Sequence, residues 1–127
     1  MSEPSFGLGP IGQVMVPVRD AERATSFYRD VLGMRFLFAF PHMAFFDADG
    51  VRLYLGEPET DDFRGTATIY FRVADIDAAV TALEARGVVF TGRPHVVHED
   101  AVHRLWMCFT KDPDGNIIGL MSEVPAG

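Results

Sequence analysis

Three histidines and a glutamate form the densest group of residues in this sequence that could do chemistry. His95, His98, Glu99 and His103 lie within nine residues of one another. Imidazole and carboxylate groups bind Zn²⁺, but this spacing is not a recognised ligand pattern. Strand alternation would also turn His95 and His98 to opposite faces. We therefore favour a polar loop with one histidine at the mouth of a pocket; the segment could instead be a flap over a ligand.

Acid–base catalysis has three candidates, which are His103, Tyr54 and Tyr70. His103 is suited to the role because the unperturbed pKa of histidine lies near neutrality. Cys108, the only cysteine, lies beside no helix N-terminus or basic motif that would lower its pKa, so we expect a buried structural thiol. A single cysteine also excludes an internal disulfide and fits a reducing cytoplasm.

The elements that position these residues occur twice along the chain. Asp20 and Asp75 are each a natural N-cap in front of a helical pattern of apolar residues. The first pattern ends at Gly33, 13 residues after its cap, and the second ends at Gly87, 12 residues after its cap. A glycine at this place supplies the left-handed residue that stops a helix. Matched landmarks of this kind indicate tandem modules.

Each predicted helix occupies the same place in the same order of strands. Alternating or apolar segments bounded by turn residues predict strands at 11–18, 35–40, 43–47, 51–55, 66–73, 88–97, 104–110 and 116–123. The order is therefore βαβββ twice, an α+β fold in one domain, 1–127. Module one covers about 11–57, a polar linker covers 58–65, and module two covers about 66–123. The extra residues of module two lie between Pro94 and His103, where we expect an inserted loop.

Strand alternation divides the side chains of each module between two faces. Branched and aromatic residues on one face should pack against the helices, and a mixed set should line a concavity of the sheet. The mixed set consists of Gln13, Met15, Arg52, Tyr54, Thr68, Tyr70, Gly119 and Met121. Apolar walls with a few polar anchors suit a small-molecule pocket, although this face could also meet solvent or a second subunit. Phe45, Phe46 and Trp106 could stack a planar ligand, but core packing explains them at least as well.

Four stretches make the chain resemble the vicinal oxygen chelate superfamily, which contains glyoxalase I, bleomycin-resistance proteins and extradiol dioxygenases. They are Arg19-Asp20, Phe27-Tyr28-Arg29-Asp30-Val31-Leu32-Gly33, Phe71-Arg72-Val73-Ala74-Asp75 and Asp112-Pro113-Asp114-Gly115-Asn116. The resemblance extends over nearly the whole chain. It implies two tandem βαβββ modules that form a cupped mixed β-sheet, and usually a homodimer, with modules that could be exchanged between subunits.

The resemblance also implies where a divalent metal would bind. Metal-dependent members use His, Glu or Gln at positions that fall here on Gln13, Tyr54, Thr68 and Gly119. Only Gln13 offers a usual ligand group, so we expect no metal and no other cofactor. We therefore predict a protein that binds a small molecule in the concavity of the sheet. The alternative is a lyase, isomerase or dioxygenase that uses a non-standard divalent metal site or acid–base residues.

The overall charge and hydropathy exclude several classes of partner. The net charge is −7 and the chain has a single lysine, Lys111, so it lacks the basic clusters that bind nucleic acid. No apolar run is long enough to cross a membrane. The first residues have neither the basic nor the apolar region of a signal peptide, which again favours the cytoplasm.

Overall fold

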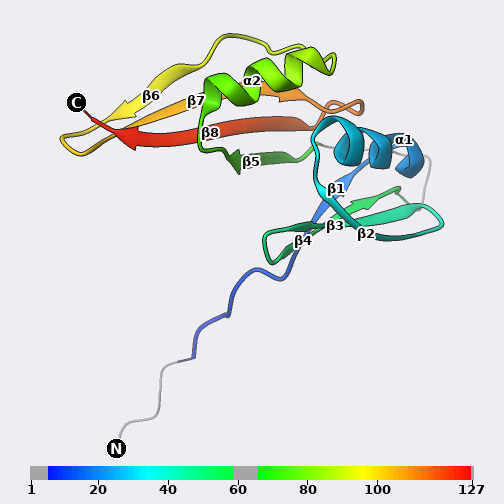
Figure 1. The fold of residues 1–127 in the computed structure, drawn as a ribbon. Coiled ribbons are helices and arrows are strands. Elements are labelled where there is room, and N and C mark those ends of the chain that lie inside the picture. Colours follow the sequence, from blue (N-terminus) through cyan, green and yellow to red (C-terminus); the bar gives the residue numbers. More distant parts are fainter. Residues whose placement is uncertain (1–5, 59–65, 127) are drawn as a thin grey trace, which may run out of the picture.

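The computed structural model describes residues 6–58 and 66–126, and most of them belong to two similar modules. Module one contains β1 (Gln13–Pro17), α1 (Ala21–Ser26), the π-helical turn η1 (Phe27–Val31), β2 (Arg35–Phe40), β3 (Met43–Ala48) and β4 (Val51–Gly56). Module two contains β5 (Thr68–Arg72), α2 (Ile76–Ala85), β6 (His95–Glu99), β7 (His103–Lys111) and β8 (Ile117–Pro125). The duplicated βαβββ order predicted from the sequence is therefore confirmed (Figure 1).

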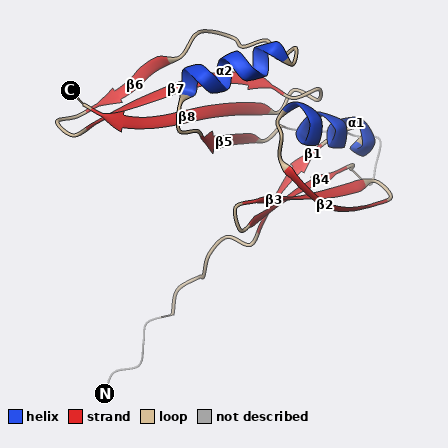
Figure 2. Cartoon of the chain, in the orientation of Figure 1, coloured by secondary structure: helices blue, strands red, loops and turns tan. Residues whose placement is uncertain are grey.

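Both modules build their sheets in the same way. Each has four strands, in the order β1-β4-β3-β2 in module one and β5-β8-β7-β6 in module two. The first strand pairs in parallel with the last, and the remaining neighbours pair antiparallel. In each module the helix covers one face of the sheet and leaves the other without a helix (Figure 2). We call the uncovered side the open face.

Local chemistry explains where the helices begin and end. The Asp20 carboxylate accepts hydrogen bonds from the backbone N–H groups of Glu22 and Arg23, at 3.0 and 3.1 Å. Asp75 caps α2 in the same way, with a 3.1 Å bond from the N–H of Ala78. Gly33 and Gly87 follow the helices with φ of 73° and 91°. No helix in the described part of the chain is long and apolar enough to span a membrane.

The first helix is not the single α-helix that its apolar pattern predicts. It changes after Ser26 into a wider turn in which the N–H of Leu32 bonds to the carbonyl of Phe27 at 3.0 Å. This turn contains Tyr28, which is almost completely buried and reaches across to module two. The wider turn thus coincides with the point where module one is anchored to its neighbour.

Two apolar clusters form the core, one under each helix. The cluster under α1 includes Val16, Phe46 and Leu55 from module one and Ile118 from β8 of module two. The cluster under α2 includes Val80 of that helix together with buried residues of β7 and β8. Because the first cluster takes a residue from the other module, the modules share apolar packing as well as a linker.

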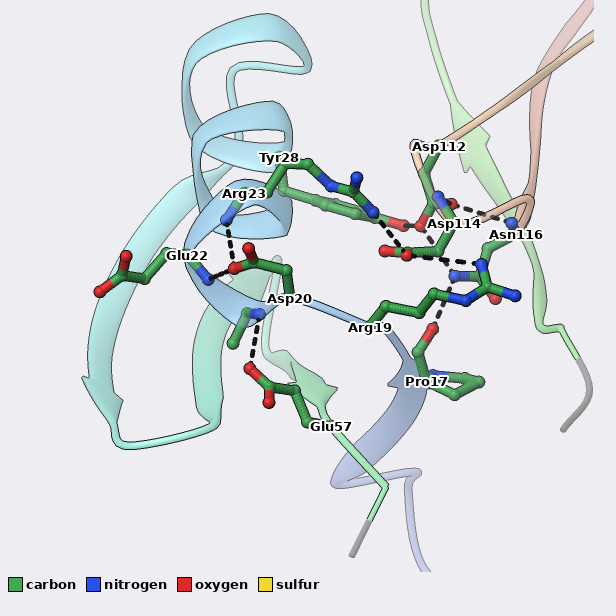
Figure 3. A network of polar contacts seen from close by, with 11 residues as sticks. Pro17, Arg19, Asp20, Glu22, Arg23, Tyr28, Glu57, Asp112, Asp114 and Asn116 are labelled. Atoms are coloured by element: carbon green, nitrogen blue, oxygen red, sulfur yellow. Dashed lines mark hydrogen bonds and ion pairs between the residues drawn. The ribbon is translucent and has the colours of Figure 1, made fainter. Parts of the chain in front are cut away.

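A buried polar network completes the junction between the modules (Figure 3). The Tyr28 hydroxyl donates to the Asp112 carboxylate at 2.8 Å. The Asn116 amide nitrogen donates to that carboxylate and to the carbonyl of Pro17, both at 2.8 Å. Its amide oxygen accepts from the N–H of Ala67 at 2.7 Å. These bonds join η1 and β1 of module one to the β7–β8 turn and to the residue before β5.

A second carboxylate in the β7–β8 turn is also held by module one. The side chain of Asp114 is fully buried, and Arg23 of α1 donates to its Oδ1 at 2.8 Å. Arg19 approaches the same oxygen at 3.8 Å. Opposite charges near a buried carboxylate offset part of the cost of removing it from water. The Asp112–Asn116 stretch of the family resemblance is therefore a structural junction.

The main error of the sequence prediction lies after α2. Residues 88–94 do not form a strand, and β6 begins only at His95. Gly92 and Pro94 interrupt regular pairing in this segment, where the N–H of Thr91 bonds to the carbonyl of Phe109. The expected loop between Pro94 and His103 is instead mostly strand β6 and a tight turn.

That turn is stabilised by Asp100. Its Oδ1 accepts from the N–H groups of Val102 and His103 at 2.8 and 2.7 Å. These bonds lower the pKa of the Asp100 carboxyl, with the bond from His103 making the larger contribution. The segment is thus not the polar loop favoured from the sequence, since β6 is an edge strand hydrogen-bonded to β7.

Tyr28→Phe tests the junction. The variant leaves the ring in place and removes a hydrogen bond to a buried carboxylate, so we expect the free energy of unfolding to fall by about 1.5–3 kcal/mol. Urea denaturation measures the change. Tyr70→Phe is the matched control because Tyr70 is half exposed, and it should change the free energy by less than about 0.5 kcal/mol. Equal effects of the two variants would contradict the role of Tyr28.

The same hydroxyl gives a pH-dependent signature. Burial, followed by the nearby Asp112 carboxylate, raises the pKa of Tyr28 above its usual value. An unfolded chain loses this proton above about pH 10, whereas the folded chain retains it, so the stabilisation by Tyr28 is complete below about pH 10 and decreases above it. The difference in unfolding free energy between wild type and Tyr28→Phe should therefore be smaller at about pH 11 than at about pH 8. A constant difference would contradict this assignment.

Candidate functional site

The predicted pocket residues lie on the open faces of the two sheets. Their neighbours along the strands, such as Val16, Leu53 and Ile118, are buried toward the helices. Module one contributes Gln13, Met15, Arg52 and Tyr54, and module two contributes Thr68, Tyr70, Gly119 and Met121. The sorting of side chains by strand alternation is thus confirmed. The structure places the residues in two sets, one on each sheet.

The registers show that the internal repeat extends to the positions of individual side chains. Gln13 is the register partner of Arg52, and Tyr54 lies two residues further along β4. Thr68 is the register partner of Ile117, and Gly119 lies two residues further along β8. Gln13 therefore stands to Tyr54 as Thr68 stands to Gly119, which is the relation expected for duplicated sites.

A row of apolar side chains crosses the open face of module one. Met15, Tyr54, Phe45 and Phe38 are register partners across β1, β4, β3 and β2. The ring centres of Phe45 and Tyr54 are 4.9 Å apart at 25°, and those of Phe38 and Phe45 are 4.8 Å apart at 30°. The first pair is stacked and the second is tilted, so the three rings form an ordered row in which the central ring of Phe45 is buried. We call these four residues the aromatic row.

Gly56 allows the aromatic row to lie close to the sheet. A Cβ atom at this position would be only 2.7 Å from Cε1 of Tyr54 and 2.9 Å from Cε of Met15. The tyrosine ring and the methionine methyl group therefore occupy the space that any other residue at 56 would fill. This constraint fixes the ring of Tyr54 between Phe45 and Met15.

A polar row runs beside the aromatic row. Gln13, Arg52, Asp47 and Arg35 are register partners across the same strands. The Arg52 guanidinium lies over the rings of Phe38 and Phe45, with its carbon 5.3 and 5.6 Å from the ring centres. Asp47 directs one oxygen to the N–H of Gly50, at 3.0 Å. The open face of module one thus combines a cation with an aromatic surface.

The open face of module two has a different construction. The rings of Tyr70 and Phe109 meet edge to face, with their centres 5.9 Å apart, on either side of Gly119. A hollow of about 370 Å³ lies beside them. It is lined by Thr68, Tyr70, Thr91, Phe109, Thr110, Lys111 and Ile117. This hollow is apolar with a few hydroxyl groups and one ammonium group.

The residues at the four implied metal positions do not fit a divalent ion. Gln13 and Thr68 are exposed, and Tyr54 is held within the aromatic row. A Cβ at Gly119 would be 2.8 Å from the Tyr70 ring, so the space for a ligand side chain is already filled. Within residues 6–58 and 66–126, no group of three or more His, Cys, Asp or Glu side chains could hold a metal. Divalent sites usually need several such groups.

The histidines of the predicted cluster occupy one face of the sheet. His95 and His98 are register partners of Met107 and Leu105, and a β-bulge lies between Val96 and His98. Because Met107 and Leu105 are two residues apart, their partners share a face, so the expectation of opposite faces is wrong. The bulge accounts for the difference. It inserts one extra residue into β6, so that His98 lies on the same face as His95.

These histidines are not organised as a catalytic group. His95 Nδ1 is 3.1 Å from the carbonyl oxygen of Arg93, and His98 Nε2 is 3.6 Å from the Asp100 carboxylate. His103 lies at the start of β7, on the face that alternation assigns to Leu105. All three are exposed. Cys108, in contrast, is buried as expected, and burial raises the pKa of its thiol.

Another hollow, of about 910 Å³, lies between α1 and the β2–β3 turn. Several of its charged groups already have partners. Glu57 accepts from the N–H of Ala21 and lies 2.9 Å from Nδ1 of His42, and these contacts, in that order of size, lower the pKa of Glu57. Arg29 pairs with Asp30 at 2.9 Å. We therefore place the candidate site on the open faces, where polar groups remain available.

Sequence reasoning missed Phe38, Phe109 and Lys111 as residues of the open faces. Alternation along β7 gives a signal for the latter two, because residues 105, 107, 109 and 111 share a face. Phe38 could not be assigned in this way. A register shift between Phe36 and Phe38 breaks the alternation of β2, so that Phe36 contacts the core ring of Phe46 while Phe38 joins the aromatic row.

Comparison with known proteins agrees with this fold. The family model described as "Glyoxalase/Bleomycin resistance protein/Dioxygenase superfamily" matches residues 10–120. No curated protein sequence gives a significant match. Among solved structures, the chain is similar to a lactoylglutathione lyase from Agrobacterium tumefaciens, with a TM-score of 0.78 and 21% identity, covering 91% of this chain and 95% of that one.

Two further solved structures have comparable similarity. An integron cassette protein from the mobile metagenome of V. cholerae has a TM-score of 0.76 and 21% identity, covering 93% of this chain and 98% of that one. A glyoxalase/bleomycin resistance protein/dioxygenase from Nocardioides has a TM-score of 0.74 and 20% identity, covering 97% and 89%. At these identities the likeness establishes the fold alone.

Gly119→Ala tests whether rings fill the former ligand position. The new methyl group would meet Tyr70 at 2.8 Å and Phe109 at 3.1 Å, so the rings must shift, and we expect a loss of about 1–3 kcal/mol in unfolding free energy. Gly92→Ala is the control, because nothing lies within 4 Å of a Cβ there. Urea denaturation compares the two variants. An unchanged stability in Gly119→Ala would show that the position is open.

Proposed function

This chain belongs to the glyoxalase/bleomycin resistance protein/dioxygenase superfamily, and from that premise we propose that it binds a small organic molecule without a resident divalent metal. The observation that carries the proposal is the open face of module one. There an ordered aromatic row adjoins polar side chains, including Arg52, that could orient a ligand. Small-molecule sites usually have this combination of apolar walls and a few polar groups.

The donor set favours metal-free binding over metal-assisted catalysis. A lyase, isomerase or dioxygenase of this superfamily would use a divalent ion as Lewis acid or oxygen binder. The positions that would hold it contain an amide, a phenol, a hydroxyl and a glycine, and the rings of Tyr70 and Phe109 fill the space at that glycine. The enzyme named among the similar structures shares 21% identity with this chain, so its activity is not transferred.

We further propose that the protein is a homodimer in the cytoplasm. The open faces are exposed in the single chain, where Met15 and Tyr70 keep 45% and 49% of their surface accessible. Phe40, at the end of edge strand β2, is 59% exposed. Exposed apolar groups on the open faces and at this edge favour association with a second copy. A second copy would also enclose a bound ligand, because the open face of one chain covers only one side of that ligand.

Metal content tests the central part of this proposal. Protein purified without chelator should contain far less than one equivalent of zinc, iron, nickel or manganese by elemental analysis. A thermal-shift screen of small aromatic molecules should find ligands whose binding is unchanged by EDTA. Stoichiometric metal that is lost in the Gln13→Ala variant would contradict the proposal and favour the enzyme reading.

Light scattering during size-exclusion chromatography tests the dimer. The expected mass is twice the 14.1 kDa of one chain. Phe40→Ser should shift the equilibrium toward the single chain, because it removes apolar surface at an exposed edge. Val89→Ser, which changes an exposed residue outside the sheets, is the control. A monomer at all concentrations would exclude the dimer but leave the open faces accessible for binding.

A further inference from the structure

We infer that the ligand of module one is a planar aromatic carboxylate, whose carboxylate pairs with Arg52 and whose ring lies against the aromatic row. This inference rests on the proposed function, since it names the class of molecule that the open face would bind. Three features carry it, namely the placement of the guanidinium, the arrangement of the rings and the local balance of charge.

The Arg52 guanidinium is held in place but keeps its hydrogen-bond donors available. It lies over the rings of Phe38 and Phe45. Among the described residues, no hydrogen bond or ion pair of Arg52 is found, although Asp47 is its register partner on β3. Contact with two rings limits the orientations of the planar group, and Arg52 remains exposed to solvent. The N–H fork of a guanidinium matches the two oxygens of a carboxylate.

The rings provide a surface for a flat apolar group at a suitable distance from the cation. Tyr54 lies two residues from Arg52 along β4 and therefore on the same face. Two residues along a strand span about 7 Å at the backbone, and the Arg52 guanidinium reaches across this gap to lie 5.3 and 5.6 Å from the ring centres of Phe38 and Phe45. An aromatic ring joined to a carboxylate directly, or through one or two carbons, could therefore contact both rows. A bulky or non-planar group would lose contact with the rings.

The local charge favours an anion even though the whole chain is acidic. On this face the charged residues of the polar row are Arg35, Arg52 and Asp47, so two cations accompany one carboxylate. Asp47 already accepts from the N–H of Gly50. The net charge of −7 is spread over the whole protein, and solvent ions screen it beyond about 10 Å. A cationic ligand placed on the aromatic row would meet the Arg52 charge directly.

The test compares three ligands that share a phenyl ring and differ in charge with a fourth that has the carboxylate on a saturated ring. Isothermal titration is carried out with 3-phenylpropionate, 3-phenylpropionamide, 3-phenylpropylamine and 3-cyclohexylpropionate. We expect the aromatic acid to bind at least about tenfold more tightly than the amide and the amine, since charge-assisted hydrogen bonds are stronger than neutral ones. The saturated acid should also bind more weakly, because it cannot stack on the row.

The Arg52→Gln variant tests whether Arg52 causes the preference for the aromatic acid over the amide. In this variant the aromatic acid should lose its advantage over the amide, while the affinity for the amide stays within about twofold. Arg104→Gln is the control, because alternation along β7 puts Arg104 on the helix-facing side together with Trp106. Circular dichroism checks that both variants are folded.

The outcomes separate this inference from the proposed function. If the amide or the amine binds as tightly as the acid, or if Arg52→Gln keeps the preference, the ligand class is wrong while binding at the open face stands. If none of the four compounds binds, and the shift screen of aromatic molecules is also blank, both the ligand class and the proposed function are overturned. Acid-selective binding that depends on Arg52 supports both.

Discussion

The arrangement of the two modules depends on one buried carboxylate, that of Asp112. Its oxygens accept from the Tyr28 hydroxyl, from the Asn116 amide and from two backbone N–H groups of its own turn. Asn116 extends the network to Pro17 at the end of β1 and to Ala67 before β5. A buried carboxylate without these donors would be strongly unfavourable, so each donor helps to keep Asp112 buried. The network holds η1 and the end of β1 against the β7–β8 turn, and thereby helps to set how the two modules lie against each other (Figure 3).

The two modules provide open faces of the same backbone geometry, but the side chains on the two faces differ. At matched positions, Tyr54 contributes a ring to the aromatic row, whereas Gly119 leaves room for Tyr70 and Phe109 to approach each other. Aromatic contacts therefore occupy both of these matched positions. In module one a guanidinium lies over two rings of the open face. Under the proposed function, this pairing of ring and cation would orient an anionic ligand without a bound ion.

Much of the fold could be predicted because it rests on local chemistry. Asp20 and Asp75 act as caps, Gly33 and Gly87 adopt the left-handed conformation, and alternation placed Gln13, Arg52 and Tyr54 on the open face. The failures arise where alternation is broken or contacts are distant. A bulge in β6 reversed the expected side of His98, and a register shift in β2 kept Phe38 from being assigned to a face. The bond between Tyr28 and Asp112 joins residues 84 positions apart, so no local pattern could reveal it.

The central claim is that the open face of module one binds a flat organic anion with side chains alone. A crystal structure of the protein grown with 3-phenylpropionate, with anomalous diffraction measured to detect transition metals, tests it most directly. The account predicts density for the ring against Tyr54 and Phe45, the carboxylate within hydrogen-bond distance of Arg52, and no anomalous peak near Gln13. An anomalous peak coordinated by Gln13, or an aromatic row covered by the protein's own chains with no ligand density, would contradict it.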